Sequence, residues 1–296
     1  MKVQEIKPNG FCGGVKKAIR MINENYEQLK KPIYMLGLLV HNKKIVEAFS
    51  EKGIIVCKGS PEDELNNILE GTVIFTAHGI SPKTKQKAIE KGLNVVDTTC
   101  VNVQKVHTII KNKINEDYNV LVIGKDSHPE VKGFLGISDK VNVYTNSNNI
   151  LNKSFIINQT TLNYDELIKE FNQIKENNQN KDIVICEEIC NATKVRQNAI
   201  KENAHKYDLI IIIGDKLSNN CKSLLNVALN NNVDAIQIET IEDINSYDLS
   251  KYEKIGVTAG ASTPRCIIDE VINSLISYDK NKMYISTLKS NNYLEI

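Results

Sequence analysis

The sequence has no excess of either charge and no long apolar segment. Its 296 residues carry 37 Lys and Arg against 36 Asp and Glu, so no basic field favours nucleic acid and no charge block marks a tail. The longest aliphatic run, Leu209–Ile213, is far too short to span a membrane. Met1–Val3 leads directly into a strand pattern, so we expect neither a signal peptide nor a transit peptide. These absences predict a cytoplasmic protein that binds neither nucleic acid nor membrane.

Several familiar motifs are also missing. The 7 cysteines should be reduced thiols, metal ligands or redox centres in a cytoplasmic protein, rather than structural disulfides. The loops GDKLSNN and TAGAST are not Walker loops, so nucleotide hydrolysis is not indicated. No linker rich in Pro, Gly or Ser divides the chain. We therefore expect its parts to pack against one another.

Short β-branched runs alternate with helical segments along the chain, which predicts an α/β fold with mainly parallel sheets. The tail after Lys280 has no clear pattern, and we interpret it as a strand returning to a sheet or as the beginning of a further segment. The expected strands lie at residues 2–6, 32–37, 54–57, 72–75, 93–96, 119–123, 141–144, 155–158, 183–186, 209–213, 235–238 and 254–257.

A unit of strand, turn, cysteine and helix occurs three times. Cys100 lies 88 residues after Cys12 and 90 residues before Cys190, and Gly124 and Gly214 are also 90 residues apart. Such a period indicates an internal repeat. We expect three similar α/β domains around a pseudo-three-fold axis, with the cysteines at the centre. The predicted domains are 13–97, 98–189 and 190–280, with the N-terminal strand 1–12 and the tail 281–296 packing on the third domain or near the centre.

The three repeated cysteines each stand at a strand-to-helix turn, where the helix dipole favours a thiolate. Thiolates from three distant segments do not match the local spacing of a zinc knuckle. They fit a [4Fe–4S] cluster, in which three Cys ligands leave one iron open to act as a Lewis acid. A mononuclear zinc site stays open as an alternative. Inert packing explains the other cysteines, Cys57, Cys186, Cys221 and Cys266.

Polar side chains gather after the predicted strands, where parallel sheets bind ligands. Three histidines, together with hydroxyl and amide groups, suit a diphosphate; ordinary structural histidines are the alternative. This set is His41, His78, His128, Thr160, Ser218, Asn220 and Ser262. Glu130 follows His128 by two residues, and a carboxyl beside phosphate charge should have a raised pKa and donate protons near neutral pH. Alternatively, the dipole of its own helix stabilises Glu130 as a carboxylate.

Nine motifs resemble those of the IspH/LytB family of 4-hydroxy-3-methylbut-2-enyl diphosphate reductases. They span Gly10–Pro264 in the order GFCGGV, LVHN, TAHGIS, DTTCVNVQKVH, SHPEVKG, NQTTL, ICNATKVRQ, KLSNN and GVTAGASTP. The resemblance implies the last step of the non-mevalonate isoprenoid pathway. In that step a two-electron reductive dehydroxylation converts the substrate to isopentenyl and dimethylallyl diphosphates.

The resemblance also implies roles for residues. Cys12, Cys100 and Cys190 would hold an oxygen-sensitive [4Fe–4S] cluster, Glu130 would be the proton source, and Thr160 would orient the substrate hydroxyl. Diphosphate binding or proton relay would fall to His41, His78, His128, Ser218, Asn219, Asn220 and Ser262. Asn219 stands where the family often has serine, and it still supplies a hydrogen-bond donor.

Electrons would come from a ferredoxin, a flavodoxin or a related reductant, and we expect a monomer or a weak dimer. Two other interpretations remain. An iron–sulfur hydro-lyase would use the same open iron without net electron transfer. A non-catalytic redox or iron sensor would need an output surface, and the sequence offers no DNA-binding helix pair or basic patch.

Overall fold

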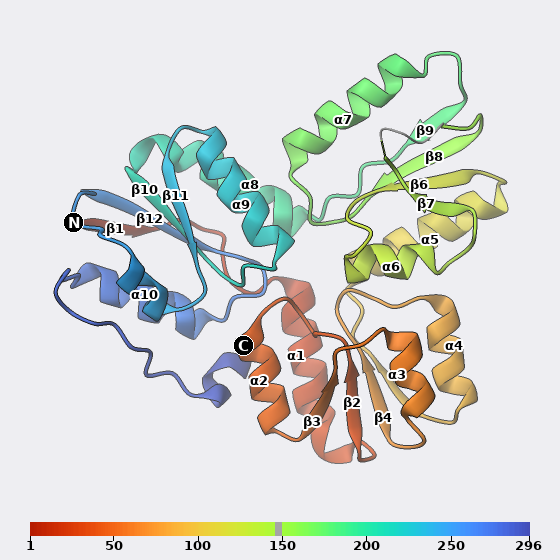
Figure 1. Ribbon diagram of the computed structural model, residues 1–296, viewed down its shortest axis with the longest axis horizontal. Coiled ribbons are helices and arrows are strands. Elements are labelled where there is room, and N and C mark those ends of the chain that lie inside the picture. The colour runs from red at the N-terminus through yellow and green to blue at the C-terminus, as the bar shows by residue number, and fades with distance from the viewer. Residues whose placement is uncertain (146–149) are drawn as a thin grey trace. The chain divides into compact units, whose positions relative to one another are not determined.

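The computed structural model describes residues 1–145 and 150–296. Over these residues, twelve strands form three four-stranded sheets in which every strand pair is parallel, and helices flank the sheets (Figure 1). The strand positions predicted from β-branched runs are confirmed. The strands are β1 Lys2–Glu5, β2 Ile33–Leu36, β3 Ile54–Cys57, β4 Thr72–Phe75, β5 Asn94–Asp97, β6 Asn119–Ile123, β7 Val141–Val143, β8 Ser154–Asn158, β9 Ile183–Ile185, β10 Leu209–Ile213, β11 Asp234–Ile238 and β12 Lys254–Ala259.

The three sheets share one strand order. The orders are β3-β2-β4-β5, β7-β6-β8-β9 and β11-β10-β12-β1. In each sheet the second strand along the chain lies on one side of the first, and the third strand lies on the other side. The third sheet takes its last strand, β1, from the N-terminus of the chain, and β1 pairs only with β12 among the described strands. Each sheet therefore has a topological switch point between its first and third strands.

Helices cover these sheets through side chains that alternate along the strands. The helices are α1 Gly13–Asn25, α2 Lys43–Glu51, α3 Pro61–Asn67, α4 Pro82–Glu90, α5 Val101–Asn115, α6 Pro129–Leu135, α7 Tyr164–Asn177, α8 Asn191–Asn203, α9 Asn219–Asn230 and α10 Arg265–Ile276. In β6, Val120 and Val122 pack with α5 and α6, whereas Leu121 and Ile123 pack with α7. None of the helices over the described residues has the length and apolar character that a membrane crossing needs.

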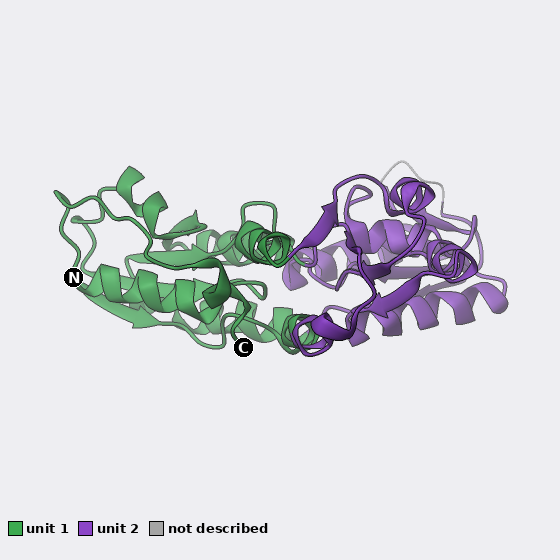
Figure 2. Ribbon diagram, turned by 90° about the horizontal axis from the view of Figure 1, so that it is seen from below, with its two compact units in different colours: residues 1–19, 40–52, 191–296 green, residues 20–39, 53–190 purple. Residues whose placement is uncertain are grey.

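The chain divides into two compact units, coloured separately in Figure 2. Unit 1 comprises residues 1–19, 40–52 and 191–296, and it contains the third sheet. Unit 2 comprises residues 20–39 and 53–190, and it contains the first two sheets. The boundaries of the three sequence domains at 97/98 and 189/190 stay a prediction.

The C-terminal tail forms no strand over its described residues, so the interpretation as a strand returning to a sheet is wrong. It ends in a 3₁₀ helix, η4 (Ser290–Leu294), which packs against α2 and α10 within unit 1. Tyr284 is buried and is joined to Asn245 through two hydrogen bonds, Asn245 Nδ2 to its carbonyl (2.7 Å) and its own N–H to Asn245 Oδ1 (2.8 Å). The segment has no strand pattern in its sequence because the side chain of Asn245, rather than pairing with a neighbouring strand, holds its backbone.

Candidate active site

The polar residues predicted from sequence flank the three switch points. Each follows the first or the third strand of its sheet, where the crevice outside the carboxyl ends of the strands forms a ligand site. They are His41 after β2, His78 after β4, His128 and Glu130 after β6, Thr160 after β8, Ser218, Asn219 and Asn220 after β10, and Ser262 after β12. These residues lie at equivalent places because the first and third strands are neighbours in all three sheets.

Each of the three repeated cysteines follows the edge strand that lies next to the third strand of its sheet. Cys100 follows β5, Cys190 follows β9 and Cys12 follows β1, and each directly precedes a helix, α5, α8 or α1. None of the three forms a disulfide in the described part of the chain, and all three are partly exposed. Burial instead raises the thiol pKa of the other cysteines, to about 11 in Cys57, Cys221 and Cys266 and by a smaller amount in Cys186. Those four are poor thiolate ligands, since a raised pKa keeps the thiol protonated.

Each cysteine is fixed by its own peptide N–H. These N–H groups donate to the carbonyl oxygens of Ala77, Thr160 and Ala261, at 3.1, 3.0 and 3.0 Å from Cys100, Cys190 and Cys12 respectively. The three acceptors occupy equivalent places, because each lies on the loop after the third strand of its sheet. We call Ala77, Thr160 and Ala261 the three anchor residues. They link each cysteine turn to a predicted substrate loop.

The anchor residues also bind the loop after the first strand, through their N–H groups. The acceptor is the Leu39 carbonyl for Ala77 (3.2 Å), the Glu130 carboxyl for Thr160 (2.7 Å) and the Asn220 side-chain oxygen for Ala261 (3.1 Å). The three sheets thus use the same connection with three different acceptors: a backbone carbonyl, an ionisable carboxyl and a neutral amide. Only the sheet with Glu130 places an acid there.

Glu130 is 1% exposed and Thr160 is 4% exposed. Thr160 donates twice to this carboxyl, from its N–H to Oε1 at 2.7 Å and from its hydroxyl to Oε2 at 3.1 Å. Burial raises the pKa of Glu130 to about 7, against the opposing effect of the two hydrogen bonds. Burial is the cause of the raised pKa within the protein itself, and the further effect predicted from phosphate charge stays a prediction.

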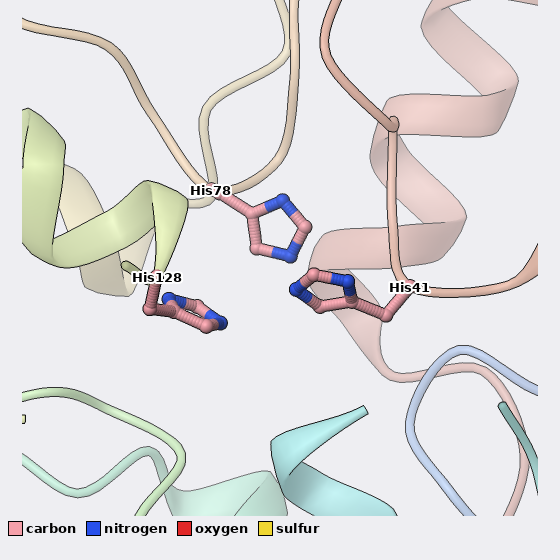
Figure 3. Close-up of side chains that lie close together, drawn as sticks. All are labelled: His41, His78 and His128. Carbon is pink, nitrogen blue, oxygen red and sulfur yellow. The ribbon is translucent and has the colours of Figure 1, made fainter. Parts of the chain in front are cut away.

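His128 and His78 lie beside this acid in unit 2. His128 is the N-cap of α6, and its Nδ1 accepts from the N–H of Glu130 at 3.2 Å. A neutral imidazole that accepts at Nδ1 carries its proton on Nε2. The rings of His78 and His128 meet edge to face with their centroids 5.4 Å apart. Figure 3 shows these two side chains, drawn together with His41 of unit 1.

His41 is held in unit 1 by the loop after β12. Its carbonyl accepts from the Ser262 hydroxyl at 3.0 Å, and the next residue, Asn42, donates from Nδ2 to the Ser262 carbonyl at 2.9 Å. Asn42 also caps α2 by accepting from the N–H groups of Lys44 and Ile45. Burial lowers the pKa of His41, while Asp215 opposes this effect. The imidazole is therefore a neutral hydrogen-bonding group near neutral pH.

The loop after β10 contributes three buried residues in unit 1. Ser218 caps α9 by accepting from the N–H of Cys221 at 3.3 Å, and Asn219 and Asn220 form the first turn of that helix. Asn220 uses its amide oxygen for Ala261 and donates from Nδ2 to the Thr193 hydroxyl at 3.4 Å. Its contacts therefore hold the loops together, and its predicted role in substrate binding stays a prediction.

The twelve predicted site residues are divided equally between the units. Unit 2 holds Cys100, Cys190, His78, His128, Glu130 and Thr160, and unit 1 holds Cys12, His41, Ser218, Asn219, Asn220 and Ser262. In unit 2, Asn102 donates from Nδ2 to the Cys190 sulfur at 3.0 Å, so the turns of Cys100 and Cys190 lie together. The convergence of Cys12 with these two cysteines stays a prediction.

Sequence analysis missed several residues that support the site. Asn42 had a recognisable signal, because Asn directly before a helix is a common N-cap. Arg196 is 4% exposed and donates to the carbonyl of Gly10, two residues before Cys12, at 2.7 Å. Nothing in a single sequence marks that long-range contact. Asn102 was within a quoted motif, but only the folded chain shows its contact with sulfur.

Comparison with known proteins decides the family. A family profile described as "LytB protein" matches residues 3–276, which include all of the candidate site residues. The chain belongs to the LytB protein family. The tail beyond residue 276, with η4, lies outside the matched range.

LytB relatives cover nearly the whole chain. A protein of Geobacillus thermodenitrificans named 4-hydroxy-3-methylbut-2-enyl diphosphate reductase is 38% identical over 295 residues, covering 95% of this chain and 92% of its own length. A protein of Bacillus cereus with the same name is 40% identical over 291 residues, covering 94% of this chain and 91% of its own. The likeness therefore extends through both units.

Solved structures agree with this assignment. The structure of E-1-hydroxy-2-methyl-but-2-enyl-4-diphosphate reductase from Plasmodium falciparum is similar with a TM-score of 0.87 and 29% identity, covering 99% of this chain and 96% of that chain. A structure described as (E)-4-hydroxy-3-methyl-but-2-enyl diphosphate reductase, the terminal enzyme of the non-mevalonate pathway, gives a TM-score of 0.68 and 31% identity, covering 94% and 100%. The predicted α/β fold is confirmed.

Proposed function

We propose that this chain reduces (E)-4-hydroxy-3-methylbut-2-enyl diphosphate to isopentenyl and dimethylallyl diphosphates, the last step of the non-mevalonate pathway. The observation that carries the proposal is the buried pair of Glu130 and Thr160, which is joined by the Thr160 carbonyl to Cys190. Thr160 thus connects Glu130, the proposed proton donor, with Cys190, one of the proposed metal ligands. The names of the LytB relatives supply the substrate.

The three repeated cysteines fit an iron–sulfur cluster. Their thiols are partly exposed and stand at helix N-termini, which favour the negatively charged sulfur that iron binds. They come from three separate sheets, and no fourth cysteine shares this position on an anchored turn in the described chain. Cys12, Cys100 and Cys190 would hold a [4Fe–4S] cluster, which when bound would supply electrons and an open iron for the substrate oxygen.

The reaction consumes two electrons and two protons, breaks the allylic C–O bond and releases the oxygen as water. With a pKa of about 7, Glu130 is substantially protonated at neutral pH and is ready to give its proton to the departing oxygen. The Thr160 hydroxyl orients that carboxyl, because it binds Oε2 while the Thr160 N–H binds Oε1. The burial of both residues excludes water from the proton transfer.

Neutral donors would bind the diphosphate. His41 is uncharged near neutral pH, and a neutral His128 that accepts at Nδ1 carries its N–H on Nε2, which would donate to the diphosphate. Ser218 and Asn219 stand at the N-terminus of α9, where the helix dipole favours an anion. His78 and Ser262 complete the set proposed for binding. Asn220 would position the loop that carries Ser262, since it binds Ala261.

Electrons would be delivered by a ferredoxin, a flavodoxin or a similar reductant in the cytoplasm. Such donors pass single electrons, so two deliveries complete one turnover. We also propose that the protein acts as a monomer or a weak dimer, because both the cysteines and the proton donor are supplied by one chain.

The proposal is tested by anaerobic reconstitution with iron and sulfide. We expect cluster absorption in the visible region and oxidation of reduced methyl viologen that depends on the hydroxymethylbutenyl diphosphate. Cys100→Ser should lose both, since one of three ligands is removed. Cys186→Ser is the matched control, because Cys186 lies only four residues before Cys190, yet its thiol has a raised pKa and no anchored turn.

Three outcomes would contradict this function. A cluster without substrate-dependent oxidation of the dye would favour a hydro-lyase or a sensor. Tight zinc binding without a cluster would favour the zinc alternative. Equal loss of the cluster in Cys186→Ser and Cys100→Ser would show that the anchored turns do not select the ligands.

A further inference from the structure

Asn102 makes a contact that the function proposed above does not use. It is the second residue of α5, and its side-chain amide donates from Nδ2 to the Cys190 sulfur at 3.0 Å. Cys100 caps the same helix. One helix therefore presents one candidate ligand at its N-cap and donates a hydrogen bond to the sulfur of a second.

The surroundings hold this contact in place. Lys105, one turn further along α5, forms an ion pair at 2.7 Å with Glu188, which lies two residues before Cys190. On the other side, the N–H of Cys190 is fixed on the Thr160 carbonyl. The sulfur of Cys190 and the amide of Asn102 are thus both positioned by neighbours within unit 2.

The contact is not shared by the other copies of the repeat. The residues at the same distance after Cys12 and Cys190 are Gly14 and Ala192, which have no side-chain donor. Only the copy with Cys100 has an amide at this place. The amide of Asn102 donates to the sulfur of Cys190, which belongs to a different copy of the repeat.

A donor to a thiolate sulfur affects a cluster through charge. Adding one electron to an iron–sulfur cluster increases the negative charge that its sulfur ligands share, so an N–H donor stabilises the reduced state more than the oxidised state. Hydrogen bonds to sulfur are among the factors that set the reduction potential. We propose that Asn102 is a positioning residue that raises the reduction potential of the cluster by donating to the Cys190 sulfur.

This inference rests on the proposed function, because it requires a cluster on Cys190. The test is an anaerobic titration of the reconstituted protein with redox mediators, followed by electron paramagnetic resonance. The variant Asn102→Leu keeps the approximate volume and removes the donor. We expect the one-electron equilibrium constant for reduction to fall about tenfold, which is a shift of the midpoint of about 59 mV to more negative potential.

A matched control comes from the same helix. Gln104 donates to the Thr99 carbonyl at 3.2 Å and has no sulfur contact among the described hydrogen bonds. Gln104→Leu should leave the midpoint unchanged, although it removes an amide from the same helix. Asn102→Asp should shift the midpoint further than Asn102→Leu, because it replaces the donor with a negative charge.

A second measurement uses the protein without substitution, in case Asn102→Leu does not assemble a cluster. With the side-chain amide nitrogen of asparagine isotopically labelled, pulsed electron paramagnetic resonance of the reduced cluster should detect coupling to that nitrogen. An unchanged midpoint in Asn102→Leu, or no coupling in the labelled protein, would overturn the inference and leave the reductase proposal standing. Failure of the unsubstituted protein to form any cluster would overturn both.

Discussion

The second and third sheets have the same strand order but different chemistry at the same connection. In the second sheet, the loop after β6 supplies the carboxyl of Glu130 to the N–H of Thr160. In the third sheet, the loop after β10 supplies the amide oxygen of Asn220 to the N–H of Ala261. Both anchor residues then accept from the N–H of a cysteine. One framework thus holds a proton donor in one copy and a neutral link in the other.

This difference separates position from function. The strand order decides which loops meet, because the first and third strands lie next to one another in every sheet. The residue type at the connection decides what that place can do. A buried carboxyl with a pKa of about 7 can hold or release a proton, whereas an amide does not titrate. This difference supports our proposal that proton transfer belongs to the second sheet, and we propose loop alignment for the third.

The largest effect is expected when Glu130 is made to resemble Asn220. Glu130→Gln keeps the size and the acceptor for the Thr160 N–H but removes the ionisable proton. We expect kcat to fall about 10²–10⁴-fold, the usual contribution of general acid catalysis, with substrate binding retained. Steady-state kinetics and calorimetric titration with the diphosphate measure the two quantities. Glu170→Gln on α7 is the control, because burial also raises the pKa of Glu170. A comparable loss of kcat in Glu170→Gln would contradict the role of Glu130 as the proton donor.

A smaller effect is expected from the hydroxyl that binds Glu130. The Thr160 hydroxyl lowers the pKa of Glu130, so Thr160→Val should raise it. Since the protonated acid is the active form, activity should decline as pH rises through that pKa. The decline should start at higher pH in the variant, by roughly one unit for the loss of one hydrogen bond. A pH–rate profile of kcat measures the shift, and Thr160→Ser, which keeps the hydroxyl, should behave like the unsubstituted protein. A shift to lower pH would contradict the assignment.

The smallest effect on catalysis is expected when Asn220 is made ionisable. Asn220→Asp keeps the oxygen that accepts from Ala261 but loses the donor to Thr193 and buries a titratable group. We expect the free energy of unfolding to fall by about 1–3 kcal/mol. The loss should be greater at pH 8 than at pH 5, because burial raises the pKa of the new carboxyl and ionisation at high pH then favours the unfolded state. Anaerobic chemical denaturation at the two pH values tests this. A loss that is independent of pH would show that position 220 tolerates charge.

Much of the fold could be predicted because its local signals are strong. The strand β10, for example, is buried along its whole length and appears in the sequence as a continuous apolar run. The repeated cysteine turns predicted three similar α/β domains, but not the strand order that the three sheets share. The raised pKa of Glu130 was predicted from phosphate charge, which stays a prediction, whereas the burial that raises it in the folded chain had no signal in the sequence. The place of Glu130 after a strand could be inferred from the sequence, but the burial of its carboxyl could not.

The hydrogen bonds that assemble the site were beyond sequence reasoning. Three peptide N–H groups, those of Cys12, Cys100 and Cys190, find carbonyls on loops far away along the chain, and backbone donors carry no residue-specific pattern. Asn220 was predicted to bind substrate because of its place in a motif, and the sequence did not show that its amide also contacts Ala261 and Thr193. Loop residues of this kind reveal their partners only when the sheets are formed.

The late arrival of β12 has a consequence for biosynthesis. A ribosome makes the chain from its N-terminus, so β1 and Cys12 emerge first, but β12 lies at Lys254–Ala259 and Ala261 follows it. All strands of the first two sheets are synthesised before β12, which pairs with β1, and before Ala261, which anchors Cys12. A nascent chain stopped before residue 254 therefore carries an unpaired β1 and an unanchored Cys12. An iron–sulfur cluster held by all three cysteines, as we propose, would therefore form with an anchored Cys12 only when translation is almost complete.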